Sequence, residues 1–239
     1  MARDSARRIR QKHIVPFEKG YYRRDTREVA RDLLGQYIVR SEAGRRLVVV
    51  RIVETEAYLG APDPASHAFG GRHTPRNSSL YLAGGHAYVY FVYGMHHCLN
   101  AVTGSSENGD AVLIRAAEAV HGESIMVRRR GLSEKPDRRP VDLAGGPARL
   151  CQALGVDRAL DGHVLASPPL QFASGPAVAD RDVLVGPRVG IGYAGPAVHW
   201  PLRFAIKDCA SVSRPRTTLQ RLTPKRWGRI MAVAATVSE

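Results

Sequence analysis

The chain has 239 residues and a formal net charge of +13, because 35 Lys and Arg residues stand against 22 Asp and Glu residues, and 30 of the cations are arginine. This length suffices for one sizeable core, and the charge favours a nucleic-acid partner, although a solvated basic surface or a GC-rich genome would give a similar composition. The three cysteines have no CxxC spacing and no apolar run approaches the roughly 20 residues of a membrane span, so we expect neither a disulfide framework, nor a zinc knuckle, nor a membrane helix.

The N-terminal half predicts a helix followed by two strands. The basic arm at residues 1–16 lacks the apolar core of a signal peptide, so we expect a cytoplasmic protein, at the nucleoid in a bacterium, or a nuclear one in a eukaryote. Asp25 and Glu28 form a capping-box pattern before an apolar stripe that stops at Gly35. A short strand is expected at residues 36–40, and the β-branched run at 46–59 predicts a strand that is covered on both faces.

The segment at residues 60–85 is dense in Gly, Pro, Ser and Asn, which predicts a long loop with a binding task. A hairpin of two strands around Gly94 follows. Further along we expect a strand at 111–117, a helix at 118–130, an exposed basic loop at 128–140, a helix at 147–154, and strands at 182–186, 188–192 and 202–206. The helix at 147–154 has Pro147 at its first position and Gly155 at its end, the usual asymmetry of helix termini. The segment from about Ser213 is basic and has no clear pattern.

Two carboxylates are the first candidates for chemistry. On one face of the predicted strand at 46–59 lie Val48, Val50, Ile52, Glu54, Glu56 and Tyr58. Because residues two apart on a strand point the same way, Glu54 and Glu56 cannot flank a scissile bond from opposite sides, so one catalytic carboxylate is expected rather than two. A buried glutamate can serve as a general base, and the competing interpretation is a glutamate that is merely neutralised by an arginine.

The histidines and tyrosines near the hairpin give a second set of candidates. His67, His73, His86, His96 and His97 lie close in sequence to Cys98, but neighbours on a strand face opposite ways and no HExxH spacing exists, so we expect no metal site and no cofactor. Strand tyrosines usually pack in the core, whereas Tyr93 adjoins the turn at Gly94 and is expected to be exposed. A rigid hairpin with an aromatic tip in a basic protein is what a wedge that enters duplex DNA would require.

Six strings resemble, in order and spacing, the alkyladenine (3-methyladenine) DNA glycosylase family of the mammalian type. They are RIVETEAYLG, HAFGGRHTPRNSSLY, AYVYFVYGMHHCLN, AVLIRAAEA, GGPARLCQALGV and RVGIGYAGPAVHWPLRF. The resemblance covers residues 17–212, which implies a glycosylase domain between the basic arm at 1–16 and a basic C-terminal tail at 213–239. The departure is at His96 and His97, which stand where relatives have aromatic or apolar residues.

The resemblance implies a role for particular residues. Glu56 would activate a water for attack on the anomeric carbon, and Arg115 would help to hold that water or a nearby phosphate, together with a carbonyl near Ile191. Tyr58, His67 and Tyr90 would enclose the flipped base, and Asn100 would exclude the exocyclic amine of normal guanine. Tyr93 would enter the minor groove and fill the gap that the flipped base leaves.

The resemblance further implies a single compact α+β domain with a curved, largely antiparallel sheet flanked by helices and a protruding, DNA-intercalating β-hairpin. The function would be monofunctional hydrolysis of N-glycosidic bonds of alkylated purines (3-methyladenine, 7-methylguanine, with hypoxanthine and ethenoadenine as further substrates) in double-stranded DNA, by a monomer. Two alternatives stay open: a catalytically silent nucleic-acid binder, which would not need Glu56, and a sugar-directed hydrolase, which would need a second carboxylate across the site.

Overall fold

The longest strand of the fold is β2 (Arg46–Tyr58), which the β-branched run forms. In the computed structural model, which describes residues 15–42, 46–132 and 139–233, β2 pairs antiparallel with β1 (Tyr37–Glu42), β5 (Ala111–His121) and β8 (Arg203–Ile206). A strand of this length can hold β1 beside its first half and β8 beside its second half. The prediction that both of its faces are covered is confirmed, since its residues from Val48 to Ala57 are almost all buried.

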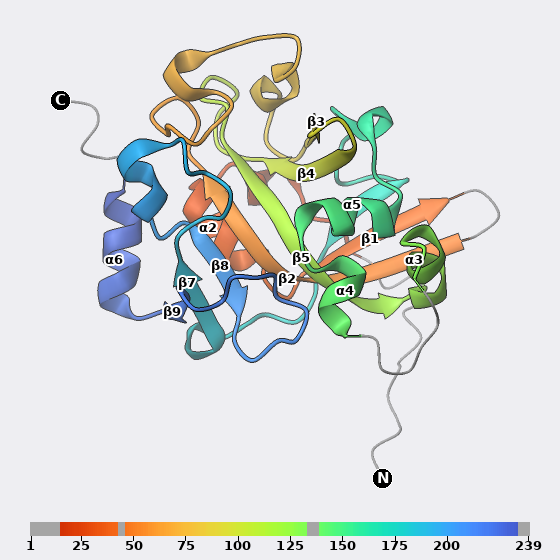
Figure 1. The fold of residues 1–239 in the computed structure, drawn as a ribbon. Coiled ribbons are helices and arrows are strands. Elements are labelled where there is room, and N and C mark those ends of the chain that lie inside the picture. The colour runs from red at the N-terminus through yellow and green to blue at the C-terminus, as the bar shows by residue number, and fades with distance from the viewer. Residues whose placement is uncertain (1–14, 43–45, 133–138, 234–239) are drawn as a thin grey trace.

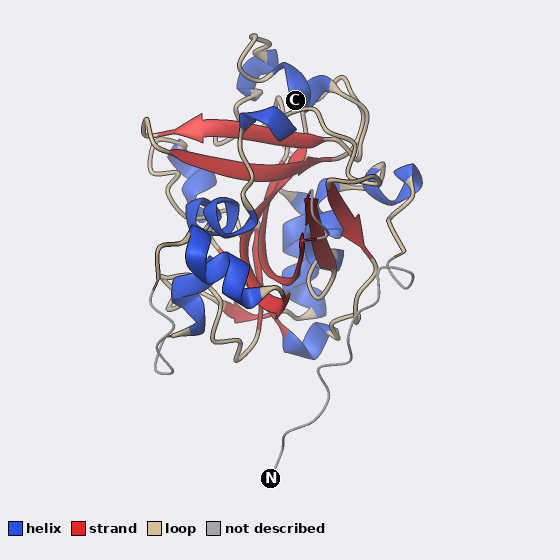
Figure 2. Ribbon diagram, turned by 90° about the vertical axis from the view of Figure 1, so that its right-hand side faces the viewer, coloured by secondary structure: helices blue, strands red, loops and turns tan. Residues whose placement is uncertain are grey.

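The described strands form one open sheet in which every pairing is antiparallel. Its order is β3 (Ala87–Val92), β4 (His96–Val102), β5, β2, β8, β7 (Val183–Gly186) and β9 (Gln220–Arg221), and β1 and β6 (Leu170–Ala173) branch from β2. Figure 2 shows the strands running through the middle of the molecule with helices around them. The expected mixture of helices with a largely antiparallel sheet is therefore confirmed.

The helices are short. They are α1 (Lys19–Tyr22), α2 (Thr26–Asp32), α3 (Glu123–Arg129), α4 (Pro140–Ala144), α5 (Pro147–Leu154) and α6 (Pro224–Ala232). Figure 1 shows α3, α4 and α5 grouped on the near side of β2 and β5, with α2 behind these strands and α6 at the far end of the sheet. The core is continuous from Val29 of α2 through the sheet to Leu150 of α5 and Ile230 of α6.

Several predicted helices are present where the sequence carries clear signals for the helix ends, such as a capping side chain, proline or glycine. Asp25 caps α2 by accepting the Arg27 N–H at 2.8 Å. The helix α5 begins at Pro147 and ends at Leu154, directly before Gly155, which has φ 63°. The predicted helix at 118–130 is half wrong, because β5 continues to His121 and α3 begins only after Gly122.

Other predictions failed where tertiary contacts override the pattern. The strand expected at 188–192 is absent, since Gly190 has φ 80° and the segment bends through turns instead of pairing. The helix α4, which begins at the last residue of the loop expected at 128–140, was not expected, and neither was β6. Residues 133–138 of that loop lie outside the described residues. Within the segment 213–239, the described residues form β9 and α6, which docks Ile230 into the core. Most of the arm at 1–16 lies outside the described residues.

Candidate active site

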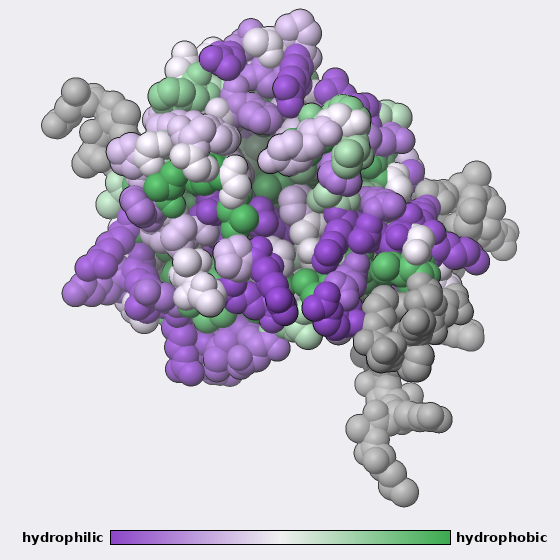
Figure 3. Space-filling view, viewed as in Figure 1, coloured by the Kyte–Doolittle hydropathy of each residue, from purple (hydrophilic) through white to green (hydrophobic). Residues whose placement is uncertain are grey.

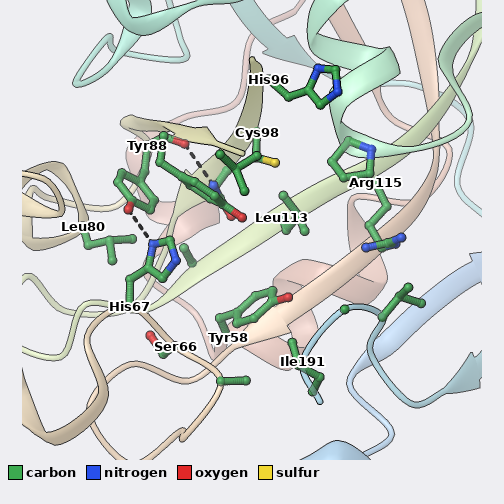
Figure 4. A pocket seen from close by; sticks show the side chains of 18 of the residues that line it. Tyr58, Ser66, His67, Leu80, Tyr88, His96, Cys98, Leu113, Arg115 and Ile191 are labelled. Carbon is green, nitrogen blue, oxygen red and sulfur yellow. Dashed lines mark hydrogen bonds between the residues drawn. The ribbon is translucent and has the colours of Figure 1, made fainter. Parts of the chain in front are cut away.

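A cavity of about 310 Å³ opens on the face shown in Figure 3, where apolar side chains form the floor of a recess whose border is largely polar. Six segments meet around it: the end of β2, the loop at 65–80, the β3–β4 hairpin, the first half of β5 with Gly109 before it, the first residues of α5 and the turn at 189–193. Figure 4 shows their side chains converging on one space, with Tyr58 and Arg115 on the sheet and His67 on the loop. The long loop that was expected to have a binding task thus forms one wall of the cavity.

Glu56 lies directly behind the wall of this cavity and has no exposed surface. Its Oε2 accepts the Tyr58 hydroxyl at 2.8 Å, and its Oε1 accepts the Val189 N–H at 2.8 Å and lies 3.3 Å from Nη1 of Arg115. All three donors line the cavity. The carboxylate is therefore one side chain away from any molecule that occupies the space.

Arg115 reaches Glu56 because of an irregularity in the sheet. Thr55 pairs with Ile114, whereas Glu54 pairs with Ala116, so Arg115 is passed over in the register between β2 and β5. An unpaired residue of this kind lets a strand re-aim a side chain, and such irregularities are common beside active sites. Burial lowers the pKa of the Arg115 guanidinium, but the fields of Glu56 and Glu54 outweigh it and raise that pKa above its ordinary value. Arg115 is thus a fixed cation.

Three aromatic side chains line the cavity as expected: Tyr58, His67 and Tyr90. The rings of His67 and Tyr90 are 4.6 Å apart, and Nδ1 of His67 lies 2.7 Å from the Tyr88 hydroxyl. Burial, aided by the charge of Arg76, lowers the pKa of His67, which favours the neutral imidazole. Burial raises the pKa of Tyr58 and Tyr90 well above the ordinary value, so both rings remain neutral phenols.

A buried ion pair covers one face of the Tyr58 ring. The guanidinium carbon of Arg188 lies 4.7 Å from the centre of the Tyr58 ring, and Arg188 pairs with Asp63 in a fully buried contact. Asp63 also accepts the N–H groups of Leu59 and Ala65, at 3.0 Å each. The pair therefore fastens the start of the loop beneath Tyr58, a contact that no spacing in the sequence indicates.

The hairpin contributes both a wall and a rim of the cavity. Asn100 is buried in the wall, where its Nδ2 donates to the Tyr88 carbonyl at 3.0 Å. Tyr93 lies on the rim at the turn between β3 and β4, and 82% of it is exposed. Its φ of 54° and that of Gly94, 67°, place both central residues of the turn in the left-handed region, which is unusual for an aromatic residue.

The structure brings together all seven residues that were expected at the site, from Glu56 to Arg115, although Glu56 itself lies behind the wall. Sequence reasoning missed the Val189 N–H, and it assigned a nearby role to a carbonyl near Ile191, whose own carbonyl accepts the Ala194 N–H. It also missed Arg76, Cys98 and Tyr193 in the lining. Among the described residues no group of three or more His, Cys, Asp or Glu side chains could hold a metal ion, and no helix is long and apolar enough to cross a membrane.

Comparison with known proteins gives consistent matches. The model of the family described as methylpurine-DNA glycosylase matches residues 20–210. A protein of the archaeon Methanocella arvoryzae is 46% identical over 198 residues, which are 82% of this chain and 94% of that protein. One from Streptomyces avermitilis is 43% identical over 215 residues (89% and 95%), and one from Desulfitobacterium hafniense is 41% identical over 196 residues (81% and 96%). All three bear the provisional name 3-methyladenine DNA glycosylase.

Proposed function

Because this chain belongs to the methylpurine-DNA glycosylase family of DNA-repair hydrolases, we propose that it removes alkylated purines that are flipped out of duplex DNA into the cavity. The substrates are 3-methyladenine and 7-methylguanine, with hypoxanthine and ethenoadenine as further candidates. The observation that carries this proposal is a buried carboxylate, Glu56, held by three donors behind an aromatic cavity of about 310 Å³.

The chemistry that suits these groups is hydrolysis with a general base. Glu56 takes a proton from a water molecule as the oxygen of that water forms a bond to C1′ of the nucleotide, and the bond between C1′ and the purine nitrogen breaks with its electron pair going to the purine. A cationic alkylated purine leaves as a neutral base, so no acid is needed. A base of this kind contributes about 10² to 10⁴ in rate. Since Glu56 has no exposed surface, the water must reach it past Tyr58 or Arg115, by a small rotation of either side chain.

The cavity lining favours a flat cation. A purine that carries a positive charge is attracted to the faces of Tyr58 and Tyr90 by cation–π interaction. The lowered pKa of His67 keeps this ring from adding a further positive charge to those of Arg76 and Arg115 in the lining at neutral pH. Asn100, fixed by its bond to the Tyr88 carbonyl, would crowd the exocyclic amine of normal guanine.

Extrusion of the base would depend on Tyr93. A tyrosine in the left-handed region costs roughly 1–2 kcal/mol relative to ordinary backbone, and strain of this kind is retained mainly at functional positions. Since Tyr93 is also largely exposed beside the cavity, we propose that the hairpin projects into the minor groove and that this ring fills the gap in the base stack. The net charge of +13 would hold the protein on the DNA backbone, where it acts as a monomer.

A panel of duplexes that each carry one lesion tests this function. The protein should release 3-methyladenine and 7-methylguanine as free bases and leave an intact abasic site, with activity that survives EDTA. No lysine lies in the motifs that resemble the family, so borohydride should trap no covalent adduct. Failure to release any base from any alkylated duplex would contradict the proposal, and tight lesion binding without release would favour the silent binder instead.

A further inference from the structure

A second buried carboxylate, Glu54, lies on the other side of Arg115. Glu54 has no exposed surface, and its Oε1 accepts Nε of Arg115 at 3.1 Å. It also accepts Nε of Arg203 at 2.7 Å. The side chains Glu56, Arg115, Glu54 and Arg203 thus form a row of alternating charge with a formal sum of zero.

The segment after β8 closes this row from behind. Ser213 donates its backbone N–H to Oε2 of Glu54 at 2.7 Å and its hydroxyl to Oε1 at 2.9 Å. The same hydroxyl accepts Nη2 of Arg115 at 3.4 Å. Arg203, which is fully buried, donates to the carbonyls of Ser213 at 3.1 Å and Pro215 at 2.7 Å. Every oxygen of Glu54 is therefore occupied, and none of these partners except Arg115 lines the cavity.

Such an arrangement is costly unless it is complete. Two buried carboxylates and two buried guanidinium groups each lose their hydration, and only close pairing and further hydrogen bonds offset that loss. Glu54 and Arg203 do not line the cavity, so base binding as such does not need them. What the row does determine is the place and the effective charge of Arg115, the only member that touches both Glu56 and the cavity.

We propose that Glu54, Arg203 and Ser213 form a positioning unit that holds Arg115 against Glu56. The negative charge of Glu54 also offsets part of the electrostatic attraction of Arg115 for the Glu56 carboxylate. With Glu54 in place, Glu56 shares the guanidinium with a second carboxylate and stays available to a proton. Without the Glu54 charge, Glu56 would face Arg115 and Arg203 with no compensating anion, and its carboxylate would be a weaker base. This inference rests on the proposed function. It assigns to the segment after β8 the role of fixing Glu54 and, through it, Arg115.

The test is the substitution Glu54→Gln, which keeps the volume and removes the charge. Single-turnover release of 7-methylguanine should fall by about 10- to 100-fold, as for a displaced catalytic group, while affinity for the lesion duplex changes by less than about threefold. The acidic limb of the pH–rate profile should move to lower pH, because Glu56 then faces more positive charge from Arg115 and Arg203. The other groups that act on Glu56 are unchanged; they are Tyr58, the Val189 N–H, Arg188, Tyr90 and Cys98. A purely structural role for Glu54 would not move this limb.

Glu118→Gln is the matched control. Glu118 also pairs with an arginine between β5 and β2, at 2.6 Å from Nε of Arg51, but it is partly exposed and outside the cavity lining. Its substitution should leave both the rate and the pH profile unchanged. Ser213→Ala is the second variant, because it removes only a hydroxyl and keeps the backbone N–H. Loss of this buried hydrogen bond should lower the melting temperature, and the rate per folded protein, measured below the melting transition, should fall by about threefold to tenfold.

The outcomes separate cleanly. A Glu54→Gln protein with wild-type rate and pH profile, or one whose rate falls only in proportion to lost folded protein, overturns the positioning unit. If Glu54→Gln does not fold, an unchanged rate in Ser213→Ala overturns it. If the wild-type protein releases no base at all, the proposed function fails. If the wild-type protein is active, Glu56→Gln is inactive and Glu54→Gln has the wild-type rate, only the inference about Glu54 fails.

Discussion

Glu54 and Glu56 are two residues apart on one strand, both are fully buried and both contact Arg115, yet their surroundings differ completely. The donors to Glu56 (Tyr58, Val189 and Arg115) line the cavity, and we call this the cavity side of Arg115. Glu54 binds Arg203 and Ser213, which do not line it, and we call this the sealed side. A carboxylate on the cavity side can exchange one donor for water, whereas one on the sealed side is fixed. We therefore expect the same side chain to act as a base at position 56 and as a fixed partner of arginine at position 54, according to the segment that packs against it.

The largest effect should come from Glu56→Gln on the cavity side. Removal of the base at nearly constant volume should slow base release by about 10² to 10⁴-fold, whereas lesion binding should persist because the aromatic walls are intact. Single-turnover kinetics and a binding titration with the same duplex measure both quantities. Release within about tenfold of the wild-type rate would remove Glu56 from the mechanism.

A smaller effect on the cavity side should come from Tyr93→Ser. Loss of the ring should weaken capture of the flipped state by about 10- to 100-fold, which corresponds to the few kcal/mol of unstacking, while Tyr93→Phe should behave as wild type. The salt dependence of binding should be unchanged, since tyrosine carries no charge. Fluorescence of 2-aminopurine beside the lesion reports flipping, and a normal signal with full excision in Tyr93→Ser would contradict a wedge.

The pH dependence of lesion binding sharpens the comparison further. Because burial lowers the pKa of His67, the neutral ring persists in the folded protein below the unfolded value near 6.5. The contribution of neutral His67 to the free energy of unfolding is fully present above about pH 6.5, and it is lost as the pH falls toward the lowered pKa of the folded protein. Once the pH reaches the lowered pKa of the folded protein, protonated His67 should repel a cationic purine, so affinity for 7-methylguanine duplexes should fall there. His67→Gln should abolish this fall, and an identical pH dependence in both proteins would refute it.

The smallest effect concerns a third carboxylate, Asp110, which does not line the cavity and is not held by the sealed side. Burial raises the pKa of Asp110 to about 6, although the hydrogen bond from Asn108 at 2.8 Å lowers it. Because this folded pKa lies above the unfolded one, ionised Asp110 destabilises the fold at neutral pH, and the penalty disappears as the pH falls below about 4. Asp110→Asn should therefore raise the melting temperature by about 2–4 °C above pH 6 and not in acid.

Its control is Asp142→Asn, because the pKa of Asp142 is lowered by the hydrogen bond from Arg139 rather than raised. This substitution should not stabilise the protein at any pH. Neither variant should change base release, since neither residue lines the cavity. A gain in stability at low pH for Asp110→Asn would show that its charge is not the cause.

The sequence predicted those parts of the molecule where local chemistry decides the structure. The β-branched run of β2, the cap at Asp25 and the Pro and Gly at the ends of α5 specify their own conformations. The turn at 188–192 could not be found in this way, because its apolar alternation is typical of a strand. Gly190 instead takes φ 80°, and the Val189 N–H donates to Glu56 and not to a neighbouring strand. The helix α6 was missed because its polar face dominates its composition, while Ile230 and Trp227 anchor it to the core.

The site was predictable in part for a similar reason. Motif order placed the expected side chains at one cavity, but the roles assigned to them remain predictions. Residue spacing offered two interpretations of a buried glutamate, a general base or a glutamate neutralised by arginine, and could not divide them between Glu54 and Glu56. The family resemblance alone assigned the base to Glu56. That division depends on the register irregularity at Arg115 and on Ser213, which is more than 150 residues away from Glu54 along the chain.

Chemical rescue tests the division of labour between the two carboxylates most directly. Glu56→Ala and Glu54→Ala would each be assayed for release of 7-methylguanine with and without added formate, with a chloride control. Formate should restore measurable release to Glu56→Ala, because a small carboxylate can replace a missing base beside the cavity, and should not restore Glu54→Ala, whose place is sealed by Arg203 and Ser213. Rescue of Glu54→Ala but not of Glu56→Ala, or wild-type release by Glu56→Ala without formate, would contradict the assignment of Glu56 as the base.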